Sequence, residues 1–144
     1  MTTNIAGHEF QREILRRAAA ENVVSHAYLF SGPDVVGKRL VALEFAGVVN
    51  CTSGGTRTSE CACGSCRKVE KGIHPDVVIV EFAGVKNIKV DQVRGDIEER
   101  LYLKPFEGRF KVVIVDEAEK LNNSAQNAFL KTLEEPPPAS IIIL

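Results

Sequence analysis

Residues 32–39 read GPDVVGKR, which matches all but the last position of the phosphate-binding loop pattern G-x-x-x-x-G-K-[ST]. Gly32 and Gly37 let the backbone turn tightly enough for its amides to surround phosphate oxygens. Lys38 adds a positive charge at the start of a helix, whose dipole also favours anions. The apolar run AYLFSG precedes the loop, and a largely apolar stretch follows it over residues 37–51. This order predicts a strand, a glycine-rich turn and a buried helix.

The residue after the lysine departs from the pattern. Nucleotide hydrolases carry Ser or Thr there to ligate magnesium, while an Asp at the end of a later strand holds the ion and an adjacent acid orients the attacking water. Asp116 and Glu117 follow an apolar run and are the candidate acids. Arg39 has no hydroxyl, and its guanidinium would either repel the cation or turn toward the phosphates. We therefore expect weak or absent ATP hydrolysis; the alternative role for the two acids is a solvated helix start.

Strand-like and helix-like segments alternate along the chain. The apolar runs at 76–82, 111–115 and 141–144 lack a polar alternation, which suits strands of a parallel sheet that is covered on both faces. Helical spacing of apolar residues occurs at 9–22, at 90–104 and from 124 to the prolines at 136–138. The predicted fold class is α/β with an open parallel sheet, whose ligands would gather at the carboxyl ends of the strands.

Several details of these elements can be stated as expectations. The first helix should pack through one face, made of Phe10, Ile14, Leu15 and Ala18. Ser124 is the candidate cap of the last helix. We expect the strand before the phosphate loop near the centre of the sheet and the final IIIL run at an exposed edge, where it would invite pairing with another chain.

All four cysteines, Cys51, Cys61, Cys63 and Cys66, fall in the Gly-rich and Ser-rich segment 51–72. Four thiolates can surround a zinc ion tetrahedrally and leave no position for a substrate, so the predicted site is structural. The alternative is that they are free or buried thiols. His74 is a further candidate ligand, but the proline after it and the strand that begins at residue 76 favour a structural turn.

Composition limits the remaining possibilities. The chain has 144 residues, of which 44% are hydrophobic, so residues 1–144 can form one domain, with 51–72 as an insert. Its 18 basic and 19 acidic side chains give a formal charge of −1, and no global field would attract nucleic acid or an anionic membrane. The start of the chain lacks the basic and then apolar pattern of a secretion signal, and no apolar run has membrane-spanning length. These features predict a cytoplasmic location and no membrane partner.

The motifs, taken in order, resemble a known family. HAYLFSGPDVVGK, the four-cysteine insert, HPDVVIVE, GRFKVVIVDEAEKLNNSAQNAFLKTLEEPP and IIIL are similar to the first domain of bacterial clamp-loader subunits, the AAA+ proteins of the DNA polymerase III holoenzyme. The resemblance implies a three-layer AAA+ fold and a zinc insert. It also implies ATP at subunit interfaces, gamma/tau and delta partner subunits, and a sliding clamp that is placed on primed DNA.

Within this family the resemblance favours the delta-prime type. Gamma/tau motors keep Ser or Thr after the lysine, whereas Arg39 and the sequence GIHPD resemble delta-prime subunits, which lend an arginine to a neighbouring ATP site. The retained acids in VDEAE leave a slow ATPase, or the gamma/tau motor itself, as the alternative. In the family pattern the strand that carries the sensor residue continues beyond Leu144. We therefore expect the chain to be truncated before the last strand and the lid domain, and to lack the arginine finger and the sensor.

The spacing of the cysteines departs from the family pattern at one place. The usual arrangement is C-x-x-C-x-x-C after a more distant cysteine, and here one residue fewer separates Cys61 from Cys63. A third interpretation treats the insert as an independent DNA-binding ribbon. Only Arg57 is basic between the first and the last cysteine, and no aromatic side chain is present for stacking on bases. Contact with a neighbouring subunit is the preferred role of the insert.

Overall fold

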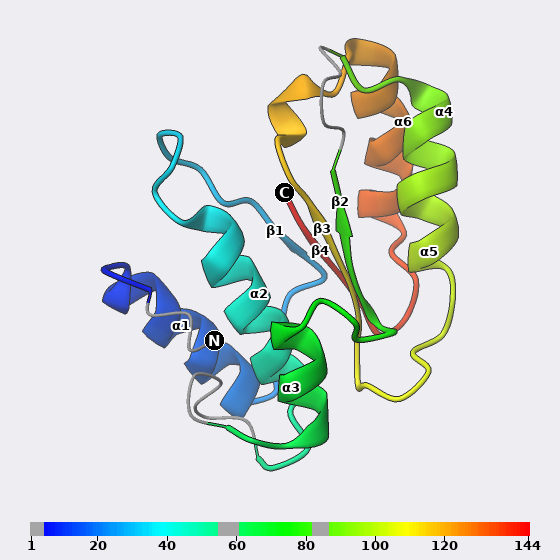
Figure 1. The fold of residues 1–144 in the computed structure, drawn as a ribbon. Coiled ribbons are helices and arrows are strands. Elements are labelled where there is room, and N and C mark those ends of the chain that lie inside the picture. The colour runs from blue at the N-terminus through cyan, green and yellow to red at the C-terminus, as the bar shows by residue number, and fades with distance from the viewer. Residues whose placement is uncertain (1–4, 55–60, 82–86) are drawn as a thin grey trace.

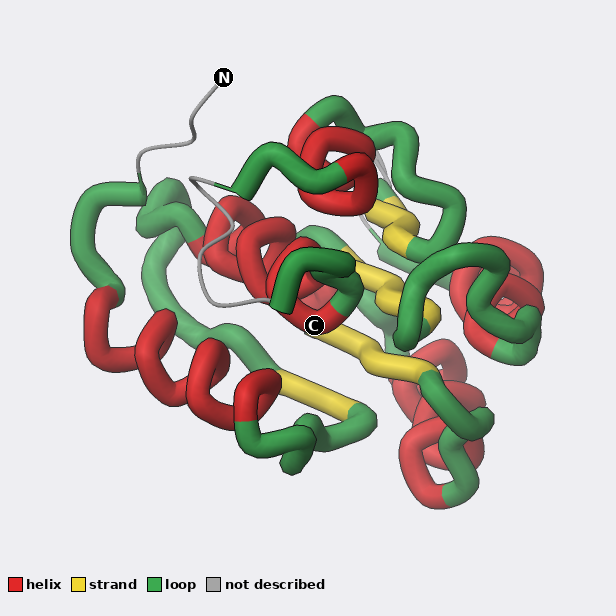
Figure 2. Tube along the Cα trace, turned by 90° about the horizontal axis from the view of Figure 1, so that it is seen from below, coloured by secondary structure: helices red, strands yellow, loops and turns green. Residues whose placement is uncertain are grey.

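The structure is a computed structural model that describes residues 5–54, 61–81 and 87–144. In the described residues, four parallel strands form one sheet in the order β1-β4-β3-β2. The strands are β1 (Ala27–Tyr28), β2 (Val77–Val80), β3 (Lys111–Val115) and β4 (Ser140–Ile143). Helices cover both faces of the sheet, as Figures 1 and 2 show. The expected α/β class with a parallel sheet is confirmed.

Three helices lie on one side of the sheet and a second group lies on the other (Figure 1). The first group is α1 (Glu9–Ala20), α2 (Lys38–Val49) and α3 (Gly64–Glu70). The second group consists of α4 (Val90–Gln92), the π-helical segment Val93–Glu98, α5 (Glu99–Leu101) and α6 (Asn123–Glu134). A 3-10 turn, Ala118–Lys120, joins β3 to α6. None of the helices in the described ranges has the length and apolar character needed to cross a membrane.

Alternate residues of the central strands pack against opposite helix layers. Val112 and Ile114 of β3 belong to the core formed with α1 and α2, whereas Val113 and Val115 belong to the core formed with the segment 90–101 and α6. All five residues of β3 and all four of β4 are buried. These strands lack polar residues at alternate positions because helices cover both faces of the sheet, as predicted.

The strand order corrects two expectations. β1, which precedes the phosphate loop, lies at an edge of the described sheet and not near its centre. β4, which contains the IIIL run, is not an exposed edge, because it pairs with β1 on one side and with β3 on the other. Three consecutive isoleucines suit this inner position, where neighbouring strands and both helix layers surround them.

Two helix details also differ from the prediction. On α1, Leu15 is buried, but Phe10 and Ile14 remain 75% and 52% exposed. The side that faces α2 instead carries Arg12 and Arg16, which pair with Glu44. At the start of α6 the capping residue is Asn122 and not Ser124, because the Asn122 Oδ1 atom accepts a hydrogen bond of 2.8 Å from the Ala125 amide. The segment 51–72, expected as a loop, contains helix α3.

Candidate functional site

The phosphate-binding loop connects β1 to α2, so Lys38 is the first residue of α2. Gly37 caps this helix with a φ of 90°, a left-handed conformation that glycine adopts without steric cost. The Lys38 Nζ atom donates a hydrogen bond of 2.8 Å to the Gly32 carbonyl oxygen. Gly32, Gly37 and Lys38 thus lie together, and the Lys38 side chain folds back over its own loop.

Arg39 projects from the first turn of α2 toward the carboxyl ends of two strands. Its Nη1 atom lies 3.4 Å from Asp116 Oδ2, just after β3, and also contacts Glu81 Oε1, just after β2. Glu81 was missed by the sequence analysis. The available signal was its place directly after the apolar run VVIV, which parallels the position of Asp116 after KVVIV.

The two candidate acids after β3 are both engaged. Asp116 Oδ1 accepts a hydrogen bond of 3.0 Å from the Glu117 amide, while Oδ2 faces Arg39. Glu117 has a left-handed backbone, with φ 55° and ψ 46°, and its Oε2 atom lies 2.5 Å from Lys120 Nζ. The site has a cation, and no hydroxyl, at the position that would ligate magnesium. The residues present therefore do not fit a bound magnesium ion.

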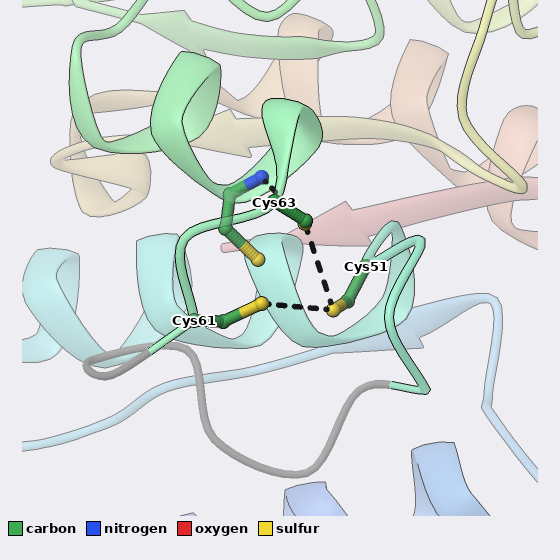
Figure 3. A group of neighbouring side chains, drawn as sticks. Cys51, Cys61 and Cys63 are labelled. Atoms are coloured by element: carbon green, nitrogen blue, oxygen red, sulfur yellow. Dashed lines mark hydrogen bonds between the residues drawn. The ribbon is translucent and has the colours of Figure 1, made fainter.

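The four cysteines converge at the junction of α2 and α3. Figure 3 shows three of them, Cys51, Cys61 and Cys63. Their Sγ atoms all lie within 4.8 Å of one another, with Cys51 Sγ 3.6 Å from Cys61 Sγ and 3.9 Å from Cys63 Sγ. A tetrahedral ion with Zn–S bonds of about 2.3 Å requires sulfur atoms ~3.8 Å apart. The cluster therefore fits a zinc ion, and Cys61 belongs to it in spite of its unusual spacing.

The surroundings of Cys63 and Cys66 shift the pKa values of these two thiols in opposite directions. Burial opposes ionisation of Cys63, but hydrogen bonds from Thr52 and from the Cys66 amide lower its pKa to about 5. Burial, together with the neighbouring thiols, raises the pKa of Cys66. Of these two thiols Cys63 therefore loses its proton more readily, and a metal ion would displace the proton of Cys66.

His74 lies outside the cysteine cluster and stabilises the turn before β2. Its Nδ1 atom accepts a hydrogen bond of 3.1 Å from the Asp76 amide, so the proton is on Nε2, which lies 3.0 Å from Ser65 Oγ. The Ser65 hydroxyl donates in turn to the Asn50 carbonyl oxygen at 2.7 Å. The structural interpretation of His74 agrees with this geometry, and the chain of contacts links the end of α2 to α3 and to β2.

Residues 7–144 match the family described as "DNA polymerase III, delta subunit". The chain belongs to this family. The family assignment agrees with the order of motifs from the phosphate loop to the last strand.

The chain is also similar to named proteins of DNA polymerase III. The chain is 38% identical to "DNA polymerase III subunit tau/gamma" of Haemophilus influenzae over 93% of its own length and 19% of that protein's. It is 38% identical to "DNA polymerase III subunit tau" of Bacillus subtilis over 98% of its length and 24% of that protein's. It therefore spans a quarter or less of each of these relatives.

A solved structure supports the same relationship at the level of fold. The chain superposes with a TM-score of 0.68 on a DNA polymerase III gamma subunit-related protein from Thermotoga maritima. The two are 30% identical, and the match covers 93% of this chain and 38% of the other. Family membership and the parallel sheet are thus supported by sequence and by structure alike.

Proposed function

We propose that this chain is the phosphate-loop module of a clamp-loader subunit, part of the complex that opens a ring-shaped sliding clamp and places it on primed DNA. Its partners would be the gamma/tau and delta subunits of the loader, in the cytoplasm. The proposal is supported by the family match over residues 7–144, by the tau and gamma names of the relatives, and by the AAA+ order of motifs.

Within the loader we propose a delta-prime-like role, in which the module contributes shape and contacts and hydrolyses ATP poorly. The observation that carries this proposal is the ion pairing of Arg39 with Asp116 and Glu81. A hydrolase needs the Asp carboxylate for magnesium and a free acid for water. Here Asp116 faces a guanidinium and Glu117 pairs with Lys120.

The cysteine cluster has a structural role in this proposal. A zinc ion held by Cys51, Cys61, Cys63 and Cys66 would fix the end of α2 to the start of α3, because the ligands come from both places. No ligand position would remain for a substrate. The described residues 51–54 and 61–72 would then form a rigid surface for a neighbouring subunit.

A second candidate is a gamma/tau-type ATPase motor. It is favoured by the names of the relatives and by the retention of both Asp116 and Glu117 at the end of β3. In this role Arg39 would leave Asp116 and Glu81, and Lys120 would leave Glu117, when nucleotide and magnesium bind.

The two roles are distinguished with the full-length protein and its sister subunits. Assembly is followed by size-exclusion chromatography, and phosphate release is measured with magnesium and ATP, for the natural protein and for Glu117→Gln. We expect co-assembly with phosphate release that does not depend on Glu117. Motor-like release that Glu117→Gln abolishes would establish the gamma/tau role instead, and failure to co-assemble would refute a clamp-loader function.

A further inference from the structure

We propose that the phosphate loop of this chain takes nucleotide as the free polyphosphate, without a divalent cation, and that Arg39 is the permanent counter-cation of the site. The inference rests on the proposed function in one respect, namely that the loop accepts nucleotide. It adds the chemical form of the ligand and the residues that compete with it.

The Arg39 guanidinium lies where a hydrolase would bind its magnesium ion. It follows Lys38 in the first turn of α2, and its Nη1 atom lies between the carboxylates that end β2 and β3. A magnesium ion entering here would meet a guanidinium, and the Asp116 and Glu81 oxygens that it requires already face that guanidinium. The site therefore disfavours magnesium for two reasons. A positive charge lies where the ion would bind, and the hydroxyl ligand is missing.

The charge of Arg39 is neutralised without metal. Its guanidinium faces the carboxylates of Glu81 and Asp116, while the loop itself carries Asp34 and Lys38. The two strand-end acids hold Arg39 from the side of the sheet, whereas Lys38 rests on the Gly32 carbonyl. A polyphosphate that reaches the start of α2 would meet helix amides, an ammonium and a guanidinium, which together supply the compensation that magnesium supplies elsewhere.

The pairs that hold Arg39 are weak enough to exchange. The side chains of Arg39, Glu81 and Asp116 are 45%, 46% and 38% exposed, so water competes for each charge. A guanidinium also matches phosphate oxygens in a two-pronged geometry that a single carboxylate contact at 3.4 Å does not use. Glu81 and Asp116 thus compete with the ligand for Arg39, and they set how tightly nucleotide binds.

The experiment measures ATP and ADP binding by calorimetry to the full-length protein, once with magnesium and once with a chelator. For the natural protein we expect binding to be weaker in magnesium than with the chelator by about tenfold or more, because magnesium sequesters the free polyphosphate. Arg39→Thr restores a hydroxyl and frees the acids, and we expect its binding to become stronger in magnesium by about tenfold or more. Arg94→Thr makes the same change at an exposed arginine of the segment Val93–Glu98 and should behave as the natural protein.

Glu81→Gln tests the competition directly. Loss of one exposed ion pair should release Arg39 and tighten nucleotide binding by up to about fivefold in both conditions. Unchanged or weaker binding would overturn the role of Glu81. Thermal melting of each variant verifies that it is folded.

Two results would overturn the inference as a whole: binding by the natural protein that is equal or stronger in magnesium, and no binding of nucleotide in either condition. Neither result bears on co-assembly with the other subunits, which is scored separately by size-exclusion chromatography. Failure of the inference and failure of the proposed function are therefore distinguishable.

Discussion

The Oδ2 atom of Asp76 lies 2.6 Å from the backbone nitrogen of Gly108, which donates a hydrogen bond to it. The amides of Phe106 and Glu107 donate to the same carboxylate at 2.6 and 2.9 Å. A Cβ atom at Gly108 would lie 2.6 Å from Asn50 Oδ1 and 3.2 Å from Asp76 Oδ2, so only glycine fits this close approach. The contacts fix the connection between α5 and β3 against the start of β2.

We expect Asp76→Asn to lower the free energy of unfolding by about 3 kcal/mol, because the amide group cannot accept as many hydrogen bonds and Asp76 is fully buried. Lys111, whose Nζ atom lies 3.7 Å from Asp76 Oδ1, would also lose its counter-charge. Urea unfolding measures the change. Asp96→Asn, at an exposed position, is the matched control and should change stability by less than about 0.5 kcal/mol. Equal effects of the two variants would contradict the role of the buried carboxylate.

Stability should fall as the pH is lowered through about 6.5, the ordinary pKa of histidine. Burial lowers the pKa of His74, although the charges of Asp76 and Glu107 act in the opposite direction. The unfolded chain therefore binds a proton at a pH where the folded chain does not, which favours unfolding on the acid side. We expect His74→Gln to reduce the loss of melting temperature between about pH 7.5 and about pH 5.5.

The control for this measurement is His26→Gln, at an exposed histidine. Protonation of the cysteines affects both variants alike, so the difference between them isolates His74. A control that flattens the pH profile as much as His74→Gln would refute the assignment. At lower pH the hydrogen bonds to Asp76 are lost as well: burial opposes its ionisation, but three backbone amides lower its pKa, so its contribution disappears below about pH 4.

Glu44 holds α1 against α2. Its carboxylate accepts from Arg12 at 2.7 and 2.8 Å and from Arg16 at 2.8 Å, and only 9% of its side chain is exposed. Burial opposes ionisation of Glu44, yet these two arginines lower its pKa. We expect Glu44→Gln to lower the free energy of unfolding by about 3 kcal/mol, because two arginines would then share a neutral partner.

Glu13→Gln provides the comparison for Glu44→Gln in the same urea unfolding series. Glu13 lies 3.8 Å from Arg17 one helical turn away, with both side chains more than half exposed. Such a pair contributes about 0.5 kcal/mol or less. If Glu13→Gln proved as destabilising as Glu44→Gln, the partial burial of the arginine pair would not be the cause.

Removal of one thiol should release the metal. We expect the purified protein to contain about one zinc per chain by elemental analysis, because a structural site uses four ligands for one ion. Cys63→Ser should lose this zinc and melt at a lower temperature. Ala62→Ser adds a hydroxyl at the exposed neighbouring position and keeps all four thiols, so it should retain the metal. A metal-free natural protein of unchanged stability would refute the site.

Local patterns were sufficient to predict much of this structure. A few neighbouring residues are enough to predict each of several features. These are the apolar strands β2, β3 and β4, the glycine-rich loop before α2 and the end of α6 at the prolines. The cysteine cluster was also predictable, because thiols at close spacing can meet without any knowledge of distant contacts.

Features that depend on distant residues were not predictable in this way. The apolar run at 141–143 does not reveal the position of β4 between β1 and β3. Any buried parallel strand has the same apolar composition, so the strand order cannot be predicted from it. Arg12 and Arg16 face α2 only because Glu44 is there to receive them, which leaves Phe10 outside. The pairing of Glu81 with Arg39 depends on the ends of β2 and β3 lying side by side, whereas the sequence shows only that Glu81 follows an apolar run.

The place of β4 has a consequence for the newborn polypeptide. Of the four strands, β4 leaves the ribosome last, yet β1 has no other neighbour in the described sheet. β2 and β3 can join during synthesis, whereas β1 and the apolar sides of α1 and α2 must wait for β4. An interruption of translation before residue 140 would leave a species that chaperones should bind.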